Sequence, residues 1–493
     1  MTCISMRTPA RARPCNHSNR RGIGASVGLD CMWRAAISLV LAACILSGCR
    51  RSPEVVDFAG SYPARASATG TIREFELVAA PSSALLFGDR PFAVWAYNGE
   101  VPGPTLRVHL GDSVRVRFTN QLPQATTVHW HGVRVPNAMD GVPGVTQPPV
   151  QPGETFVYEF TPPDAGTFWF HPHLRSSEQV ERGLFGALIV EDAAPPPFSR
   201  DELWVLDDWL LTPEGALFAE FNTRHDLAHD GRWGNVVTVN GQRIPRLAVR
   251  PGERIRLRLL NVANGRVFVP DFAGLAAHVI AVDGLYAAHP INLARFEMAP
   301  GNRMDLDIVI PADAAGQRVT VTDRFTRRAI PLAEIIVEGD PVVTPQFESP
   351  AHAHVPSWER ADRATPLRAE FRLNAQRGGP FGIQWTINGA AMDHETHALP
   401  GHLHHLPIGE FSRLRFVNES YRLHPMHMHG LFFKVLARNG VAVDEAHFRD
   451  TVLVHPKESV DIGTVPLDPG RWMLHCHILE HAESGMMTVI AVN

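Results

Sequence analysis

Beyond its first fifty residues, the sequence lacks cysteine almost completely. Five of the six cysteines precede residue 50, and the sixth is Cys476. The five are Cys3, Cys15, Cys31, Cys44 and Cys49. If this N-terminal segment is removed, Cys476 keeps no partner thiol, and a disulfide framework is excluded. Cys476 therefore requires another explanation.

Lysine is nearly absent too. Lys434 and Lys457 are the only two, and arginine supplies the rest of the positive charge, which we interpret as coding bias. The formal net charge is −5. A mildly acidic chain gives no reason to expect nucleic acid or an anionic surface as its main partner.

A long apolar run is missing as well. Residues 35–46 are apolar and follow Arg34, but this stretch is too short to cross a membrane. It leads into Leu46-Ser47-Gly48-Cys49, and residues 1–49 are therefore typical of an export signal. The last four residues resemble a bacterial lipoprotein signal, which would leave Cys49 as a lipid-bearing N-terminus in the periplasm. Plain cleavage to a soluble periplasmic protein is the alternative, and Met32 could be the true start.

Three copies of one sequence unit follow. Each copy has an Asn-Gly pair, at 98–99, 240–241 and 388–389, and then an alternating stretch that ends in asparagine. The spacing from a glycine to that asparagine is nine residues in every copy, at 111–120, 252–261 and 409–418. In the first copy Val114, Val116 and Phe118 alternate with Arg115 and Arg117. Alternation with frequent turns predicts β-sandwich domains.

The repeat also predicts the domain organisation. A chain of 493 residues is too long for one compact core. We therefore predict three similar β domains over residues 70–193, 198–340 and 366–493. Residues 50–69 and 341–365 are predicted linkers, and Pro195-Pro196-Pro197 fits the first domain junction.

Histidine, by contrast, is abundant, with 25 residues. In the first and third copies a His-x-His pair begins nine residues after the repeated asparagine, at 129–131 and 427–429. The second copy has Pro270 and Phe272 at the equivalent places. A second pair follows in each outer domain, at 171–173 and 475–477.

These pairs predict a metal centre. Side chains i and i+2 of a strand point to the same side, so each pair offers two imidazoles to one site. Neutral imidazole suits copper, zinc, iron or nickel. One pair alone is weak evidence, because most such pairs are packed or solvated. Four pairs in two repeat-related domains are hard to explain by packing.

Cys476 indicates which metal. It stands between His475 and His477, so its side chain points to the opposite face of the strand, where it can meet three further donors. Those donors are His424, His481 and Met486. Two imidazoles, a thiolate and a weak thioether form a blue-copper site, whereas structural zinc favours more thiolates or a closed tetrahedron. An inert core cysteine is the alternative.

With these motifs the sequence resembles the three-domain multicopper oxidases, which include laccases, bilirubin oxidases and bacterial cuprous oxidases. The motifs are HWHG at 129–132, HPH at 171–173, HPMHMHG at 424–430 and HCHILEHAESGMM at 475–487. The resemblance implies an all-β fold of three consecutive cupredoxin-like Greek-key β-sandwich domains. It covers the whole chain after the signal.

The resemblance also implies four copper ions. A type 1 copper would be held by His424, Cys476, His481 and Met486, and a type 2 copper by His129 and His427. A type 3 pair would be held by His131, His171, His173, His429, His475 and His477. The three-copper cluster would lie between the first and third domains, and the middle domain would act mainly as a spacer.

The activity implied is the oxidation of a reductant, one electron at a time, coupled to the reduction of O₂ to water. Electrons would pass from the type 1 site through Cys476 and its backbone to His475 and His477. Asp140 matches the family's acid beside the cluster, although Asp140-Gly141 is also a common turn dipeptide.

The remaining acids leave the proton route open. Where some bacterial members carry a glutamate after the second type 1 histidine, this chain has Ala482, and Glu480 or Glu483 could substitute. Asp450 could orient a histidine or serve a structural role.

The third copy also carries an insertion that bears on the reductant. Its aligned glycine comes 20 positions after the glycine of the Asn-Gly pair, against 12 and 11 positions in the other copies. The extra segment contains Met392, His394, His397, His402, His404 and His405. It could collect copper, with Cu(I) as substrate, but a solvated polar loop is the interpretation we favour.

Three functions follow: an oxidase of phenols and aromatic amines, an oxidase of Cu(I), or a non-catalytic copper store or scaffold. The complete ligand set argues against the scaffold, and the eight paired histidines argue against a two-domain nitrite reductase. Expected partners are O₂ and a small reductant, for a monomer.

Overall fold

The computed structural model describes residues 55–56, 66–86, 91–350, 361–362, 365–393, 397, 403–443 and 445–493. Almost all regular structure in them is β, so the all-β prediction is confirmed. The predicted export signal, with Cys49, lies outside the described residues. Among the described residues, no helix is long and apolar enough to cross a membrane.

The first pair of sheets is formed by residues 72–191. One sheet has the order β3 (Phe92–Tyr97), β2 (Ile72–Ala84), β5 (Ser113–Asn120) and β7 (Thr155–Phe160). The other has the order β4 (Leu106–His109), β9 (Gly186–Glu191), β8 (Gly166–His171) and β6 (His129–His131).

The second pair of sheets is formed by residues 200–337. Its larger sheet has the order β11 (Val236–Val239), β10 (Arg200–Trp209), β13 (Arg254–Asn261), β17 (Arg303–Val309), β15 (Ala277–Val282) and β16 (Leu285–Asn292). Its smaller sheet has the order β12 (Arg246–Val249), β19 (Ile330–Val337), β18 (Arg318–Asp323) and β14 (Pro270–Asp271).

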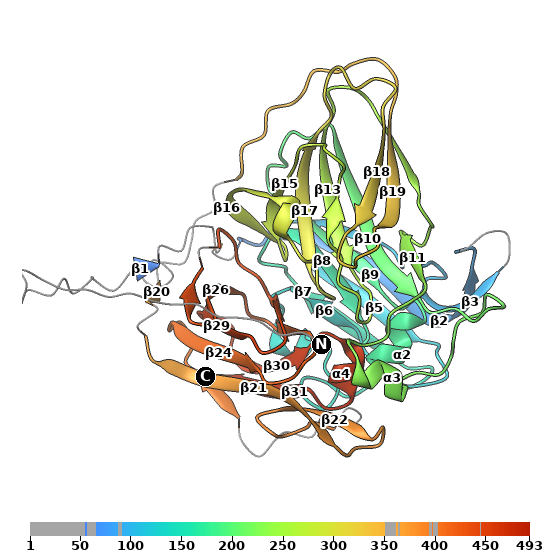
Figure 1. Ribbon diagram of the computed structural model, residues 1–493. Coiled ribbons are helices and arrows are strands. Elements are labelled where there is room, and N and C mark those ends of the chain that lie inside the picture. The colour runs from blue at the N-terminus through green and yellow to red at the C-terminus, as the bar shows by residue number, and fades with distance from the viewer. Residues whose placement is uncertain are drawn as a thin grey trace, which may run out of the picture. The chain divides into compact units, whose positions relative to one another are not determined.

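The third pair is formed by residues 367–492, coloured orange to red in Figure 1. One sheet has the order β22 (Ile383–Ile387), β21 (Leu367–Arg377), β24 (Ser412–Asn418), β29 (Ser459–Thr464), β26 (Phe433–Arg438) and β27 (Val441–Ala442). The other has the order β23 (His404–Leu406), β31 (Met487–Val492), β30 (Gly470–Cys476), β25 (His424–Met428) and β28 (Thr451–Val454).

The remaining elements are short. β1 (Val55–Val56) pairs with β20 (Ala361–Asp362). The helices are η1 (Asn137–Met139), α2 (Ser176–Glu181), α3 (Arg224–Ala228), η2 (Leu293–Arg295) and α4 (Leu479–Glu483). Three pairs of sheets in chain order agree with three repeated units, for which we propose the limits 70–193, 198–340 and 366–493.

The alternating stretches form the strands expected of them. In β5, Val114, Val116 and Phe118 are fully buried in the core of the first sheet pair. Arg115, on the other face, donates to Glu159 and Glu74 of the neighbouring strands. One face therefore supplies the apolar core, and the other supplies charged cross-strand pairs.

The repeated Asn-Gly pairs make the same turn three times. Asn98, Asn240 and Asn388 have φ of 54°, 52° and 54°, and a glycine of positive φ follows each. Each asparagine side chain accepts from one backbone N–H and donates to one backbone C=O of the strand that pairs with the one before the turn, which is β2, β10 or β21. Asparagine tolerates the left-handed conformation, so the sequence pair encodes both the turn and its attachment.

The asparagine that ends each alternating stretch also has one repeated role. Asn120, Asn261 and Asn418 are buried, and each accepts the backbone N–H two residues later. Each also donates through Nδ2 to carbonyl groups of two separate loops. The nine-residue spacing therefore places one loop-closing amide in every unit.

This role, repeated in all three units, predicts the effect of Asn261→Ala. The variant leaves buried N–H and C=O groups without partners, and we expect it to lower the free energy of unfolding by about 2–4 kcal/mol. Asn292→Ala is the control, because Asn292 is exposed and accepts only the N–H of Ala294, at 2.9 Å. Urea unfolding measures both, and equal losses would contradict the assigned role.

Candidate metal centres

Strand pairing brings the four His-x-His pairs into register. β6 is antiparallel to β8, with His129 opposite His171. β25 is antiparallel to β30, with His427 opposite His475. The partner histidine of each pair lies two residues further on, so each outer unit presents four imidazoles on one face of a sheet. All eight are buried.

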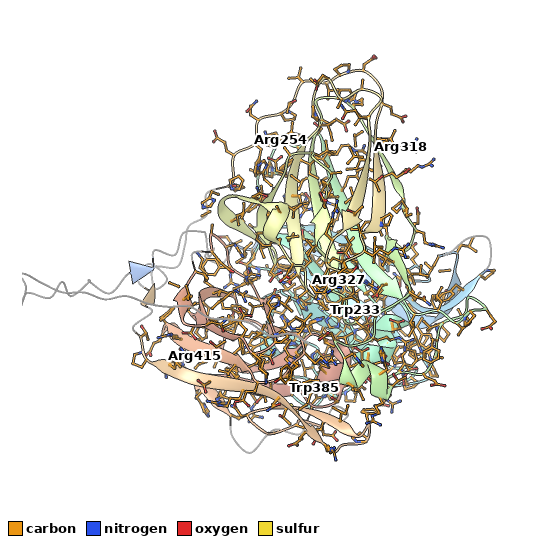
Figure 2. All side chains as sticks on the ribbon, in the orientation of Figure 1. Trp233, Arg254, Arg318, Arg327, Trp385 and Arg415 are labelled. Carbon is orange, nitrogen blue, oxygen red and sulfur yellow. The ribbon has the colours of Figure 1, made fainter. Side chains whose placement is uncertain are left out.

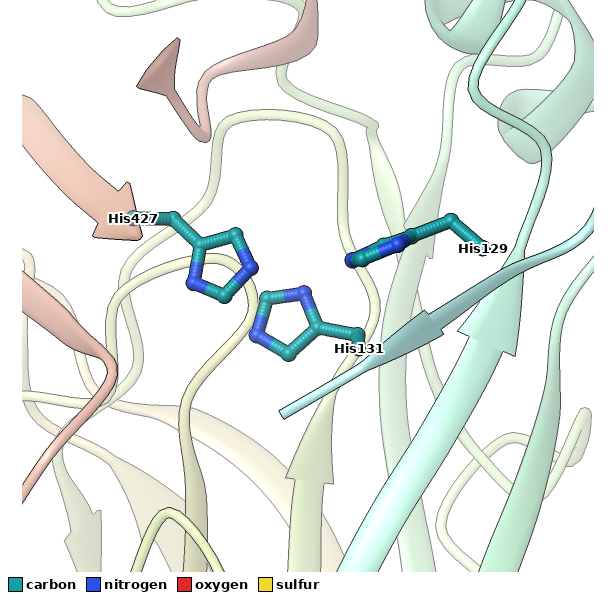
Figure 3. Close-up of side chains that lie close together, drawn as sticks. All are labelled: His129, His131 and His427. Atoms are coloured by element: carbon teal, nitrogen blue, oxygen red, sulfur yellow. The ribbon is translucent and has the colours of Figure 1, made fainter. Parts of the chain in front are cut away.

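The two outer units bring these imidazoles together in three groups. In each group the ligand atoms lie within 4.8 Å of one another. The groups are His129, His131 and His427; His131, His171 and His477; and His173, His429 and His475. Figure 3 shows the first group, in which His427 of β25 faces the rings of His129 and His131, which belong to β6. Every group combines residues of both outer units.

The outward-facing ring nitrogens are held by hydrogen bonds. Nδ1 of His129 contacts the Asp140 carbonyl oxygen at 2.7 Å, and Nδ1 of His427 contacts that of Asp450 at 3.0 Å. Nδ1 of His171 contacts the Pro172 carbonyl at 2.9 Å. Such bonds fix the tautomer and orientation of a metal-binding imidazole.

Several ring nitrogens of the cluster have no hydrogen-bond partner. This is true of Nε2 of His129, His171 and His427, Nδ1 of His131 and His173, and both ring nitrogens of His477. Buried polar atoms are rarely left in this state. Cations bound within the three donor groups would satisfy those that face them.

The close approach of His429 to His475 shows where a cation is needed. Nδ1 of His475 donates to the Cys476 carbonyl at 2.7 Å, and Nδ1 of His429 donates to Asp140 Oδ2 at 2.8 Å. In the neutral imidazoles both Nε2 atoms therefore carry lone pairs, yet these atoms are 3.0 Å apart. Burial lowers the pKa of both rings well below its usual value, so a proton does not relieve the repulsion. A metal ion between them would.

Two of the predicted acids touch the cluster. Asp140 contacts His429 through its carboxylate and His129 through its backbone carbonyl. Asp450 Oδ1 lies 3.3 Å from Nε2 of His131. Burial alone would raise the pKa of Asp450, but the Arg303 guanidinium and His427 hold it at about 2, so Asp450 is a carboxylate.

A second candidate centre lies on the other face of β30. Cys476 Sγ is 3.6 Å from Nδ1 of His424 and 3.8 Å from Nδ1 of His481. These two nitrogens are 3.3 Å apart. Three donors roughly 2.0–2.3 Å from one ion, at angles near 120°, lie about 3.5–3.8 Å from each other, so the set fits a trigonal His₂Cys site.

The surroundings of this centre are apolar. Cys476 and Met486 are buried in the same apolar cluster, although no contact places the Met486 sulfur beside the other donors. Burial raises the pKa of the Cys476 thiol, so metal binding must displace its proton. Ser420 Oγ contacts Nε2 of His424 at 2.9 Å and fixes that ring.

The second unit covers the outer edge of His481. Nε2 of His481 donates to the His229 carbonyl at 2.8 Å, and the ring is fully buried. Trp385 of β22, labelled in Figure 2, packs against it with ring centroids 4.2 Å apart. His481 therefore has no direct opening to solvent.

The two glutamates of α4 have different surroundings. Glu480 accepts from Asn264 Nδ2 at 2.8 Å and from the Arg232 N–H at 3.1 Å, and burial raises its pKa to about 7. Glu483 lines a cavity of about 10 Å³ together with His173, His475 and Ala482. That is room for about one water molecule. The structure thus brings Glu483 near the cluster and turns Glu480 toward the second unit.

The histidine-rich insertion is only partly described. His394 and His402, and His352 and His354 of the preceding linker, lie outside the described residues. Met392 is buried in an apolar cluster, and His404 and His405 belong to β23. His397 is buried, with its ring centroid 5.7 Å from that of His173. Sequence reasoning did not single out this contact, because no repeat or motif marks His397.

Known proteins share this architecture. Three segments match family models described as multicopper oxidase, over residues 82–195, 200–322 and 364–493. Multicopper oxidase MmcO of Mycobacterium tuberculosis is 30% identical, over 80% of this chain and 82% of that protein. Copper resistance protein A of Escherichia coli is 25% identical, over 88% and 94%. A solved multicopper oxidase from Pseudomonas thermotolerans is 32% identical with a TM-score of 0.77, over 87% of this chain and 100% of that one.

The buried imidazoles predict a pH-dependent stability of the metal-free protein. Burial lowers the pKa of His171 well below 6.5, whereas the unfolded chain regains the ordinary value. Below about pH 6.5 the unfolded state therefore binds a proton that the folded state does not, and stability falls as the pH falls. His171→Asn should gain stability relative to the parent by up to about 1.4 kcal/mol per pH unit in that range.

Urea unfolding of the metal-free proteins from about pH 7.5 to about pH 5.5 measures this difference. Taking the difference between variant and parent cancels the buried acids, such as Glu480, which act in the opposite sense. His405→Asn, at an exposed position, should run parallel to the parent. A His171→Asn curve that also runs parallel would contradict the neutral, buried imidazole.

Proposed function

The chain belongs to the multicopper oxidase family, and we propose that it couples the one-electron oxidation of a small reductant to the reduction of O₂ to water at four coppers. Its fold is three cupredoxin-like β-sandwich domains, and it is an oxidoreductase with O₂ as electron acceptor. The copper sites and the reductant are proposals that rest on the residues described above.

The observation that carries the proposal is the arrangement along β30. His475 and His477 belong to the histidine cluster, and Cys476 between them belongs to the His₂Cys site. Three consecutive residues thus connect an electron-transfer site and a multinuclear site by a few covalent bonds. A copper store or a scaffold has no need of such a connection.

The donor groups suggest the ligand sets. We assign the type 1 site to His424, Cys476 and His481, with Met486 as the weak fourth ligand, and the type 2 site to His129 and His427. The type 3 pair is assigned to His131, His171 and His477 on one side and to His173, His429 and His475 on the other. When bound, the coppers would supply the redox chemistry, at type 1 toward the reductant and at the cluster toward O₂.

Protons for water formation would come from carboxylates beside the cluster. Asp140 accepts from Nδ1 of His429 through Oδ2, and its buried Oδ1 lies 3.4 Å from Nδ1 of His129, so this carboxylate is in contact with the cluster from both outer units. Glu483, at the small cavity beside His173 and His475, takes the place left by Ala482. Its carboxylate is held by the Ser177 N–H and by Asn222 Nδ2, each at 2.7 Å.

The surface outside His481 favours a metal ion as reductant. His225 of α3 and His229 are exposed and lie side by side, with ring centroids 4.2 Å apart and the ring planes tilted by 31°. The His229 carbonyl accepts the hydrogen bond from His481. The backbone of His229 therefore connects this pair of imidazoles directly to the His481 ring, which would accept the electron. Imidazole binds copper well. Oxidation of four Cu(I) to Cu(II) would supply the four electrons that O₂ and four protons need to form two waters.

Phenols and aromatic amines are the second candidate class, since one relative is a laccase of Botryotinia fuckeliana. Copper resistance protein A of Escherichia coli agrees better with Cu(I). We further propose export to the periplasm through residues 1–49, a lipid anchor at Cys49 and a monomeric state.

Cys476→Ser tests the oxidase assignment. Serine cannot supply the thiolate, so the copper-loaded variant should lose the intense thiolate-to-copper absorption, about one copper per chain and all but a trace of O₂ uptake. Met487→Leu is the control, because Met487 is buried next to the same loop but in a separate apolar cluster. If Cys476→Ser kept its O₂ uptake, the function would be wrong.

The double change His225→Ala and His229→Ala tests the reductant. Loss of both imidazoles should lower kcat/KM for Cu(I) about tenfold, mainly through KM. His404→Ala with His405→Ala removes two histidines of β23 and should leave that value unchanged. An unchanged value in the first variant, or an equal loss with a phenol as reductant, would contradict a copper-docking pair.

A further inference from the structure

The second unit has none of the paired histidines, yet it reaches the histidine cluster. Gly301, in the turn before β17, has a φ of +88°, and a Cβ there would lie 2.9 Å from His131 Cε1 and from His477 Cδ2. Only glycine lets the backbone approach two rings this closely in that conformation. The turn at 299–303 therefore packs directly on the cluster.

Arg303 follows this turn and is fully buried. Its guanidinium has five N–H groups, and each has a partner. Nε donates to the Thr167 carbonyl at 3.0 Å. Nη1 donates to the Gly301 carbonyl at 3.2 Å and to Asp450 Oδ1 at 3.0 Å. Nη2 donates to the Asp283 carbonyl at 2.8 Å and to Asp450 Oδ2 at 2.7 Å.

Asp283 holds the backbone of the same segment. Its Oδ2 accepts the N–H of Asp450 at 3.1 Å and that of Thr451 at 3.2 Å. Its Oδ1 accepts the N–H of Arg303 at 3.0 Å. Arg303 and Asp283 thus fix both the carboxylate and the peptide of Asp450.

Asp450 in turn holds histidines of both outer units. Its Oδ1 lies 3.3 Å from Nε2 of His131, in the first unit. Its carbonyl oxygen lies 3.0 Å from Nδ1 of His427, in the third unit. Thr451 Oγ1 contacts the same His427 nitrogen at 3.0 Å. Any displacement of residues 450–451 would therefore turn one ring from each outer unit.

From these contacts we propose that Arg303 and Asp283 are positioning residues for the three-copper cluster: through Asp450 they set the orientation of His131 and His427. The second unit is then a working part of the oxygen-reducing site as well as a connection between its neighbours. This inference rests on the proposed function, because it assumes that the cluster holds copper.

Arg258 separates a positioning role from simple domain attachment. It is also buried in the second unit and also reaches Thr167, through Nη1 to Oγ1 at 2.8 Å. Its other partners are Asp201 and Asp305, and none of its hydrogen bonds goes to Asp450 or to a histidine. Arg303→Lys and Arg258→Lys are therefore matched changes that keep the charge and lose the planar fork.

The experiment compares copper-loaded Arg303→Lys with Arg258→Lys and the parent. Arg303→Lys should change the type 2 electron paramagnetic resonance signal and lower kcat for O₂ reduction about 10–100-fold, as losses of such outer partners do. KM for the reductant and the type 1 absorption should stay as in the parent, since Arg303 contacts no residue of that site. Arg258→Lys should show the parental signal and kcat.

A parental type 2 signal and kcat in Arg303→Lys, or the same changes in Arg258→Lys, would overturn the proposal. If Arg303→Lys does not fold, Asp283→Asn carries the test, because it keeps the shape of the side chain and removes an acceptor from the Asp450 segment. Copper binding and O₂ uptake of the parent protein are measured separately. If it binds no copper and takes up no O₂, the proposed function fails, whereas a difference confined to the variants concerns only the positioning role.

Discussion

The alternation of side chains along two paired strands is the constraint on which both metal centres depend. Successive residues of a strand point to opposite faces, so His475 and His477 face one way and Cys476 the other. The pairing of β25 with β30 extends this rule, because Met426 lies opposite Cys476 and His427 opposite His475. His424 therefore shares the face of Cys476, while His427 and His429 share the face of His475.

That rule explains how much of the site could be predicted from the sequence. The His-x-His spacing, the cysteine between two histidines and the repeated asparagines all express local geometry, which a single strand or turn determines. The spacing alone therefore separated Cys476 from His475 and His477, whereas the pairing of β25 with β30 is what places His424 on the face of Cys476. The all-β fold followed for the same reason, since alternation and Asn-Gly turns are local features.

The groups that sequence analysis missed are those held by contacts between distant segments. Arg303 and Asp283 lie 147 and 167 residues before Asp450 in the chain, and no periodic pattern marks them. The His229 carbonyl over His481 is a backbone atom, which a motif of side chains does not reveal. The family resemblance implied that the middle domain acts mainly as a spacer. The structure adds that its turn at 299–303 packs on the cluster.

Burial gives these centres their chemical character. Several cluster imidazoles are held at one ring nitrogen by a carbonyl group, and seven ring nitrogens of the cluster have no hydrogen-bond partner. A site of this kind is prepared for cations and is unfavourable without them, since lone pairs face each other at 3.0 Å. Copper suits both the imidazoles and the single thiolate.

The measurement that tests this account most directly is the copper content of the purified parent protein together with its absorption spectrum. The account predicts four copper ions per chain and an intense thiolate-to-copper absorption from Cys476. Fewer than about three coppers per chain, or a colourless copper-loaded protein, would contradict it.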